Sequence, residues 1–229
     1  MMDFKTNEQL LSEAVKKGDR REVNLLIELG VDPNWRDGDG VSALHLAAEL
    51  PDTGILEDIL AHRRTKVDIR DDEGATPLHY AARARRAGAI EKLIAAKAVV
   101  DARDNSLGTS LMEASSRGGA EAVEILLRKG AQPNAQSDKL YTALHYAVNH
   151  DRTEVVRLLT KAKADPLLAN RHGITPMDLA RRKSQDDDAK IMVSLLSGAE
   201  SQIYLETGTQ ADIAAPQRAS FIRKKSPSP

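Results

Sequence analysis

The segment Thr76-Pro-Leu-His79-Tyr-Ala-Ala82 decides the fold, because variants of it recur along the chain at a fixed period. The copies begin 33 or 34 residues apart, at Ser42, Thr76, Thr109, Thr142 and Thr175, and a degenerate copy begins near Gln9. A second apolar segment with helical spacing follows each copy, as in Val123-Glu-Ile-Leu-Leu127. A period of this length indicates a repeat protein, in which each unit buries its apolar surface against its neighbours.

Each copy has the features of a helix start. Thr76 and its equivalents supply a hydroxyl that accepts a hydrogen bond from a free helix amide. Pro77 and Pro176 follow at the first helical position, where a missing N–H costs nothing. Alanines such as Ala81 and Ala82 let helices approach closely, while larger aliphatic side chains of the second segments fill the layer between units. We therefore expect two helices in every unit.

The composition excludes several function classes. The chain has 33 Lys and Arg against 34 Asp and Glu, so its net charge of -1 attracts neither nucleic acid nor an anionic membrane. It has no cysteine, which excludes disulfides and thiolate metal sites. Asp3 and Glu8 lie where a secretion signal would be apolar, and no apolar run is long enough to span a membrane. We expect a soluble cytoplasmic protein, with a nuclear location or secretion into a host cell as alternatives.

These segments resemble those of ankyrin-repeat proteins. Gly74-Ala-Thr-Pro-Leu-His-Tyr-Ala-Ala82 matches the family's Gly-x-Thr-Pro-Leu-His-x-Ala-Ala, and Gly130-Ala-Gln-Pro-Asn-Ala135 nearly matches its Gly-Ala-Asp-x-Asn-Ala. The similarity covers about residues 5–199 and recurs six times. It implies an all-α fold, an α-solenoid of stacked helix–turn–helix repeats joined by β-hairpin-like loops.

The period and the resemblance divide the chain into repeats and a tail. We expect an N-terminal capping repeat (1–36), repeat 1 (37–70), repeat 2 (71–103), repeat 3 (104–136), repeat 4 (137–169), a C-terminal capping repeat (170–199) and a tail (200–229). The tail has low hydrophobic content, which is typical of disorder. Alternatively, its apolar side chains fold back on the last repeat; these are Tyr204, Leu205, Phe221 and Ile222.

Some positions depart from the family pattern. Lys97 and Lys163 replace the glycine that follows the second helix, so the turn there is expected to be strained or rebuilt. In the last repeat, Arg181, Arg182 and Lys183 are expected to face solvent as part of a terminal cap.

The histidines are the main candidates for chemistry. His45, His79 and His145 share one repeat position, and repeat translation keeps them apart rather than converging on one site. The resemblance implies that each bridges its helix to the backbone of the neighbouring hairpin. Met112 and Asp178 replace this histidine in two units, which predicts looser joints there.

Other catalytic and metal-binding patterns are weak or absent. The segment 32–41 has Arg36 and Val41 where a calcium loop needs oxygen ligands. The run Asp186-Asp-Asp188 precedes a helix expected to start near Lys190, where acidic groups favour the helix dipole. The sequence contains no phosphate-binding loop, nucleophile elbow or His-Glu-x-x-His motif. We expect no catalytic residue, no cofactor and no metal, and hence no enzyme.

The resemblance implies that function lies in a concave surface of hairpin tips and first helices, which binds proteins. By repeat position, the candidate partner-binding residues are Trp35, Arg36, Arg70, Arg83, Arg103, Asn105, Arg117, Lys139, Tyr141, His150 and His172. The predicted function is a non-catalytic interaction module or adaptor, acting as a monomer. The alternatives are a regulatory or inhibitory subunit of a partner enzyme and a host-directed bacterial effector.

The arginines near the centre allow two interpretations. Guanidinium groups bind carboxylates bidentately, so five arginines would form a basic patch for a partner with an acidic surface, and these are Arg83, Arg85, Arg86, Arg103 and Arg117. However, Arg36, Arg70 and Arg103 each precede an aspartate, and a ladder of exposed salt bridges would give the same pattern. The sequence leaves both open.

Overall fold

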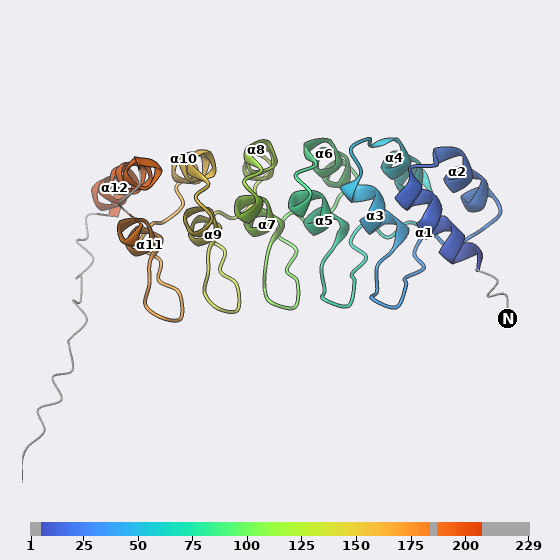
Figure 1. The fold of residues 1–229 in the computed structure, drawn as a ribbon, viewed down its shortest axis with the longest axis horizontal. Coiled ribbons are helices and arrows are strands. Elements are labelled where there is room, and N and C mark those ends of the chain that lie inside the picture. Colours follow the sequence, from blue (N-terminus) through green and yellow to red (C-terminus); the bar gives the residue numbers. More distant parts are fainter. Residues whose placement is uncertain (1–5, 184–186, 208–229) are drawn as a thin grey trace, which may run out of the picture.

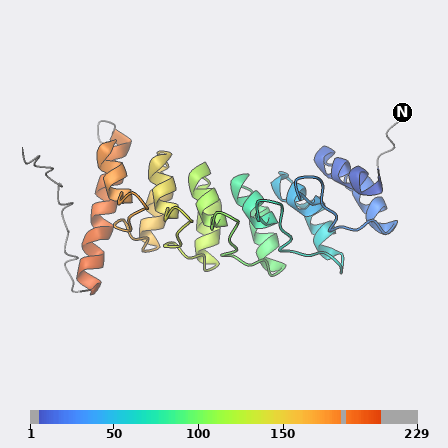
Figure 2. The same ribbon diagram turned by 90° about the horizontal axis from the view of Figure 1, so that it is seen from below.

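The computed structural model describes residues 6–183 and 187–207, which form two parallel rows of helices with loops projecting from one row (Figure 1 and Figure 2). The first helices of the pairs are α1 (Asn7–Lys17), α3 (Ala43–Glu49), α5 (Pro77–Arg83), α7 (Ser110–Arg117), α9 (Ala143–Asn149) and α11 (Pro176–Arg182). The second helices are α2 (Arg20–Glu28), α4 (Gly54–Ala61), α6 (Ala87–Ala95), α8 (Ala120–Arg128), α10 (Thr153–Lys161) and α12 (Asp187–Thr207). The predicted all-α repeat fold is confirmed.

The predicted start signals begin the first helices. The Thr142 hydroxyl accepts the N–H of His145 at 3.4 Å, and the Thr175 hydroxyl accepts that of Asp178 at 3.0 Å. Pro77 and Pro176 occupy the first helical position. The hairpin loops contain no strand within the described residues, and an isolated bridge pairs Arg36 with Ser42.

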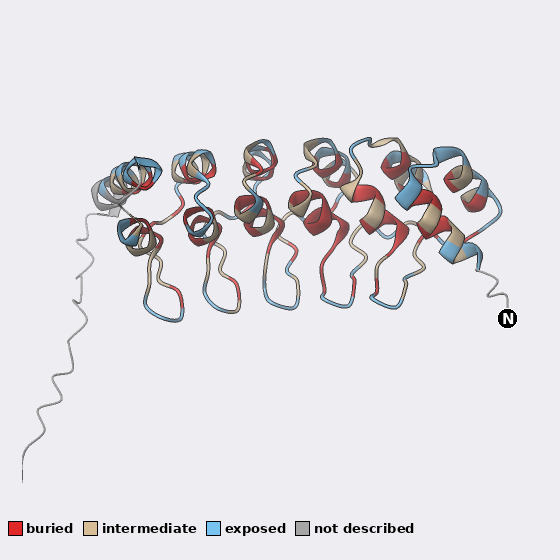
Figure 3. Cartoon of the chain, in the orientation of Figure 1, coloured by how far each residue is buried: buried red, intermediate tan, exposed pale blue. Residues whose placement is uncertain are grey.

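The core runs along the stack between the two rows (Figure 3). Each first helix contributes one large buried side chain at the same repeat position, and these are Leu11, Leu44, Leu78, Leu111, Leu144 and Met177. Second helices add side chains such as Leu56, Ile90 and Val123, which are fully buried. Because each first helix packs on the next, a unit buries its apolar surface only in the presence of its neighbours.

Arginine side chains link successive hairpin loops. Nη1 of Arg36 donates to the carbonyl oxygen of Arg70 at 2.9 Å, and Nη1 of Arg70 donates to that of Arg103 at 2.6 Å. Arg103 continues the series to the carbonyl oxygen of Gln136 at 2.8 Å. Within residues 6–183, none of these arginines forms an ion pair with an aspartate, so the interpretation as a salt-bridge ladder is wrong.

The aspartates that follow these arginines close their own loops instead. Oδ1 of Asp37 accepts the N–H of Val41 at 2.9 Å, and Oδ1 of Asp71 accepts that of Ala75 at 2.7 Å. Oδ1 of Asp104 accepts two loop amides in the same way. A carboxylate that caps loop amides is held away from the neighbouring guanidinium, which explains why the pairs do not form.

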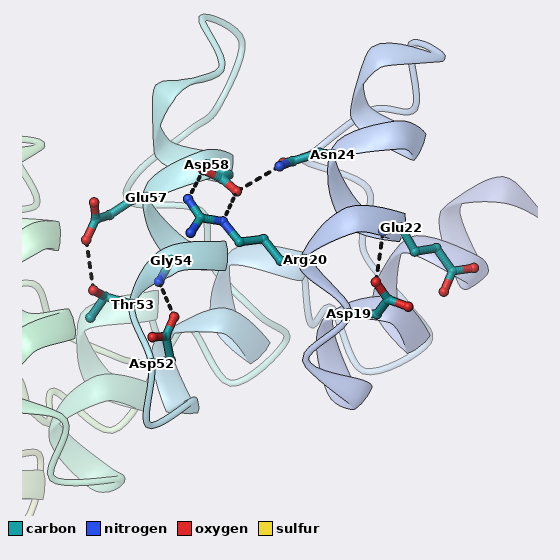
Figure 4. A network of polar contacts seen from close by, with 9 residues as sticks. All are labelled: Asp19, Arg20, Glu22, Asn24, Asp52, Thr53, Gly54, Glu57 and Asp58. Carbon is teal, nitrogen blue, oxygen red and sulfur yellow. Dashed lines mark hydrogen bonds and ion pairs between the residues drawn. The ribbon is translucent and has the colours of Figure 1, made fainter.

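The second helices form the outer row of the stack, and a bidentate ion pair joins the two at its N-terminal end, α2 and α4 (Figure 4). Nε and Nη2 of Arg20 donate to the two carboxylate oxygens of Asp58 at 2.6 and 2.8 Å, and Asn24 donates to the same carboxylate at 3.0 Å. The hydrogen bond from Arg20 holds the pKa of Asp58 below its usual value. This contact ties α2 to α4.

The C-terminal end differs from the prediction in two ways. Helix α12 begins at Asp187 rather than near Lys190, and Asp187 pairs with Lys190 within its first turn at 2.7 Å. The helix continues to Thr207, so residues 200–207 are helical and not disordered, because no glycine or proline interrupts the sequence between Gly198 and Gly208. Phe221 and Ile222 lie outside the described residues, as do the side chains of Tyr204 and Leu205.

The prediction that Lys183 faces solvent is wrong. Its ammonium group donates to the carbonyl oxygens of Val148 and Asn149 at 3.2 and 2.6 Å and pairs with Asp151 at 2.8 Å. A cation at the C-terminal end of a helix compensates the unpaired carbonyls there, so Lys183 caps α9 across the repeat boundary. Arg181 and Arg182 are exposed, as expected.

The turns without glycine are strained, as predicted. Lys97 and Lys163 adopt left-handed conformations, with φ of 73° and 61°, in place of a glycine such as Gly130. Leu107 and Leu140 also have positive φ, at hairpin tips where other units have Gly40, Gly74 and Gly173.

Candidate partner-binding face

The first helices leave one face mostly outside the core, although Tyr80 on this face is buried, with 8% exposed. On each helix, three positions spaced i, i+3 and i+4 lie on this face, because such residues are neighbours on one side of a helix. In α5, α7 and α9 they are Tyr80, Arg83, Ala84, Glu113, Ser116, Arg117, Tyr146, Asn149 and His150. We call this surface, with the adjoining hairpin tips, the inner face; it corresponds to the predicted concave surface.

A polar cluster surrounds Tyr80. Its hydroxyl donates to Oδ2 of Asp71 at 2.8 Å, and burial together with this carboxylate raises the pKa of Tyr80 to about 12. The guanidinium carbon of Arg83 lies 4.2 Å from the centre of the Tyr80 ring. Nη2 of Arg83 also pairs with Glu49 at 3.3 Å, so Arg83 links repeats 1 and 2.

Glu113 occupies the equivalent position on α7, between Tyr80 and Tyr146 of the adjacent units. It is half-buried, and within residues 6–183 its carboxylate has no hydrogen bond or ion pair. Burial raises its pKa, even though the charges of Arg83 and Arg117 act in the opposite direction. A carboxylate that has lost part of its hydration without gaining a partner is costly to the fold.

Three aromatic rings cluster next to this position. The Tyr141 ring lies 5.2 Å from that of His145 and 5.6 Å from that of Tyr146, measured between centres. Burial raises the pKa of Tyr146. Tyr141, a predicted binding residue, therefore packs on its own repeat with one side and remains half-exposed with the other.

An acidic hollow of about 420 Å³ adjoins Tyr80 at the hairpin tips. It is lined by Asp39, Val41, Asp71, Asp72, Glu73 and Tyr80. Asp71 accepts hydrogen bonds from the Tyr80 hydroxyl and from the N–H of Ala75 in its own loop. The carboxylates of Asp39, Asp72 and Glu73 have no side-chain partner within residues 6–183. The hollow thus presents acceptors without matching donors.

The three equivalent histidines form the predicted bridges. Nε2 of His45 lies 3.1 Å from the carbonyl oxygen of Ala75, and His79 and His145 make the same contact to the next hairpin at 3.3 and 3.0 Å. In each case Nδ1 accepts the N–H of the threonine or serine that caps the helix, so Nε2 carries the proton. Burial lowers the pKa of all three histidines, which keeps them neutral.

The predicted binding residues fall into two groups. Arg36, Arg70, Arg83 and Arg103 use their guanidinium groups within the protein, as described above, and Asn105 donates to the carbonyl oxygen of Asp72 at 3.0 Å. Five others have no ion pair or side-chain hydrogen bond within the described ranges, and these are Trp35, Arg117, Lys139, His150 and His172. Trp35 is half-buried and the other four are exposed.

Sequence reasoning missed Tyr80, Glu113 and Tyr146. It placed residues 83, 117 and 150 on the inner face but omitted the residue one helical turn earlier, which shares that face. The signal was available, since the residue after the bridging histidine recurs with the period, and Glu113 is the one charged residue at this position in the five full repeats.

Neither a metal-binding cluster nor a membrane-spanning helix is found in the parts of the chain that the structure describes. Among residues 6–183 and 187–207, no three histidine, aspartate or glutamate side chains converge as a metal ion would require. None of the helices in these ranges combines the length and apolarity needed to cross a lipid bilayer.

Comparison with known proteins identifies the class. A family model for ankyrin repeats (three copies) matches residues 11–106 and again residues 108–203. The chain therefore belongs to the ankyrin-repeat family, whose repeats generally mediate protein–protein interaction and are typically non-catalytic. A search of curated proteins finds no match.

Proposed function

We propose that the chain is a non-catalytic protein–protein interaction module, an adaptor that binds one or more partner proteins on the inner face. The observation that carries this proposal is the set of polar side chains on α7 and α9 that the fold does not use. Ser116, Arg117, Asn149 and His150 lie together on this face, and none of their side chains bonds to another residue in the described ranges. We also propose that the protein is a cytoplasmic monomer and that it binds neither nucleic acid nor membranes.

A partner with an acidic surface is a finer form of this proposal. Arg117 and Lys139 are the exposed cations that support it. Arg70, Arg83 and Arg103 support it less than the sequence indicated, since their guanidinium groups already bond to groups of the protein. A regulatory subunit of a partner enzyme, or a host-directed effector, would use the same face and would form a stoichiometric complex.

Affinity capture from native lysate, followed by mass spectrometry, tests the proposal. A variant carrying Arg117→Glu, Asn149→Glu and His150→Glu alters the inner face, whereas Lys129→Glu with Lys161→Glu makes the same change in net charge on the outer helices. We expect specific partners to bind the wild type and the outer-face variant and to be lost from the inner-face variant. Circular dichroism must first show equal folding, and capture of the same partners by all three proteins would exclude the inner face.

A further inference from the structure

Glu113 is the charged member of a row on the inner face that is otherwise apolar and aromatic in the five full repeats. The residue after the bridging histidine, or its replacement, is Leu46, Tyr80, Glu113, Tyr146 and Leu179 in these units, and Glu13 in the N-terminal capping repeat. The row runs across neighbouring first helices, because α3, α5, α7, α9 and α11 pack side by side. A carboxylate at the centre of such a row gains nothing from packing.

Three other carboxylates near this row have a structural partner. Glu49 pairs with Arg83, Asp71 accepts the Tyr80 hydroxyl, and Asp104 closes its own hairpin. Glu113 has no such role within residues 6–183, and the charges of Asp104 and Glu73 add to the negative potential around it. A cation supplied from outside the chain would satisfy it.

The charges that remain available also favour a basic ligand. The cations Arg70, Arg83 and Arg103 already donate to the protein. The unpaired groups around the neighbouring hollow are instead the carboxylates of Asp39, Asp72 and Glu73. Arg117 is an exposed cation at the end of α7, and its charge does not outweigh the effect of burial on Glu113.

The protein itself displays the binding mode at the adjacent unit. Arg83 of α5 lies over the Tyr80 ring at 4.2 Å and pairs with Glu49 on the neighbouring first helix α3 at 3.3 Å. A cation between an aromatic face and a carboxylate is favourable because the ring and the anion both attract it. Because Arg83 already covers the Tyr80 ring, the free counterpart is Glu113 with the half-buried Tyr146 of the following unit, where no cation pairs with the carboxylate within residues 6–183.

We infer that the inner face of repeats 1 to 4 receives a basic segment of a partner protein, whose lysine or arginine side chain pairs with Glu113 beside Tyr146. Further basic residues of the segment lie in the hollow lined by Asp39, Asp72 and Glu73. This inference rests on the proposed function and specifies the chemistry of the partner.

Binding of two labelled homopeptides of equal length, one of lysine and one of glutamate, tests the inference with the full chain by fluorescence anisotropy. We expect the lysine peptide to bind and Glu113→Gln to weaken its binding about tenfold, since a hydrogen bond to a charged group of this kind contributes about 1.5 kcal/mol or more. The matched control is Glu124→Gln, which removes the same charge from the outer helix α8 and should change binding less than about twofold. Glu113→Leu, which copies Leu46 and Leu179, provides a second variant that should fold.

Four results would overturn the inference. Equal weakening by Glu113→Gln and Glu124→Gln would mean unspecific attraction, and tighter binding of the glutamate peptide would favour the acidic partner instead. Binding of the lysine peptide only after Arg223, Lys224 and Lys225 are replaced by glutamine would make the chain's own C-terminal segment the occupant. If lysate partners still require the inner face while neither peptide binds, the proposed function stands and this inference fails.

Discussion

Repeats 2 and 3 are neighbours in the stack, but they use their first helices differently. Helix α5 begins within Thr76-Pro-Leu-His-Tyr-Ala-Ala82, and it has a proline at its first position and a histidine bridge to the next hairpin. Helix α7 begins within Thr109-Ser-Leu-Met-Glu-Ala-Ser115, and it has neither feature. It also contains two buried hydroxyls without a hydrogen-bond partner, those of Ser110 and Ser115.

The difference shows where the molecule departs from the most stable sequence for its fold. In α7, Met112 replaces the bridging histidine, the buried serines replace proline or alanine, and Glu113 replaces an apolar or aromatic residue. Each change lowers the expected stability, and together they lie at the centre of the proposed binding face. Departures from local rules that cluster at one place are typical of functional sites, where stability is exchanged for recognition.

The largest expected effect on stability comes from replacing His79 of repeat 2 by methionine, the residue at this position in repeat 3. His79→Met removes the contact to the Gly108 carbonyl and leaves the buried N–H of Thr76 without its acceptor. We expect the free energy of unfolding to fall by about 2–3 kcal/mol in urea denaturation. His172→Met, at an exposed hairpin tip, should have little effect, and equal losses in the two variants would refute the bridging role.

The bridging histidines also predict the pH dependence of stability. Burial lowers the pKa of His45, His79 and His145, whereas in the unfolded chain a histidine has a pKa of about 6.5. Below that pH the unfolded chain binds protons that the folded chain does not, so the stability falls with decreasing pH, by up to about 1.4 kcal/mol per unit for each histidine.

Melting curves at pH 7.5 and pH 5.5 measure this dependence. His79→Met should lessen the loss of stability at the lower pH, and Met112→His should increase it by adding a bridge to repeat 3. An unchanged pH dependence in His79→Met would assign the acid sensitivity to other groups.

A smaller increase in stability is expected from removing a buried hydroxyl of α7 that has no hydrogen-bond partner. Ser115 is fully buried, and Ser115→Ala removes a hydroxyl that has no hydrogen-bond partner while restoring the alanine found at Ala48 and Ala82. We expect the unfolding free energy to rise by about 1 kcal/mol. The control Ser116→Ala changes a half-exposed hydroxyl next to it, and an equal gain there would point to helix propensity alone.

The smallest effect concerns the hairpin tip of repeat 3. Leu107 has φ of 57° and is 45% exposed, whereas repeat 2 has Gly74 at this position. Leu107→Gly should raise the unfolding free energy by about 0.5 kcal/mol, because relief of the left-handed strain slightly exceeds the entropy cost of glycine. Ser106→Gly, in the same tip but without positive φ, should instead lower it.

The candidate site was predictable only in part. Repeat position predicted that Arg117 and His150 share one side of the first helices, because helical spacing fixes which side chains share a face. It gave no indication that Arg70 and Arg103 donate to carbonyl groups of the next hairpin, or that Lys183 caps α9. Long side chains have many rotamers, and the acceptors they reach lie in a different repeat.

The period and the helix starts followed from the sequence alone, because they depend on local rules repeated at a fixed spacing, whereas the histidine bridges were implied by the family resemblance and join two units. Only the tertiary structure decided which charges are used within the protein and which remain free. Arg83 is paired with Glu49, while Glu113, one repeat away, has no partner within residues 6–183. The reason is physical: these contacts join residues about one repeat apart, and their distances are set only when the units stack.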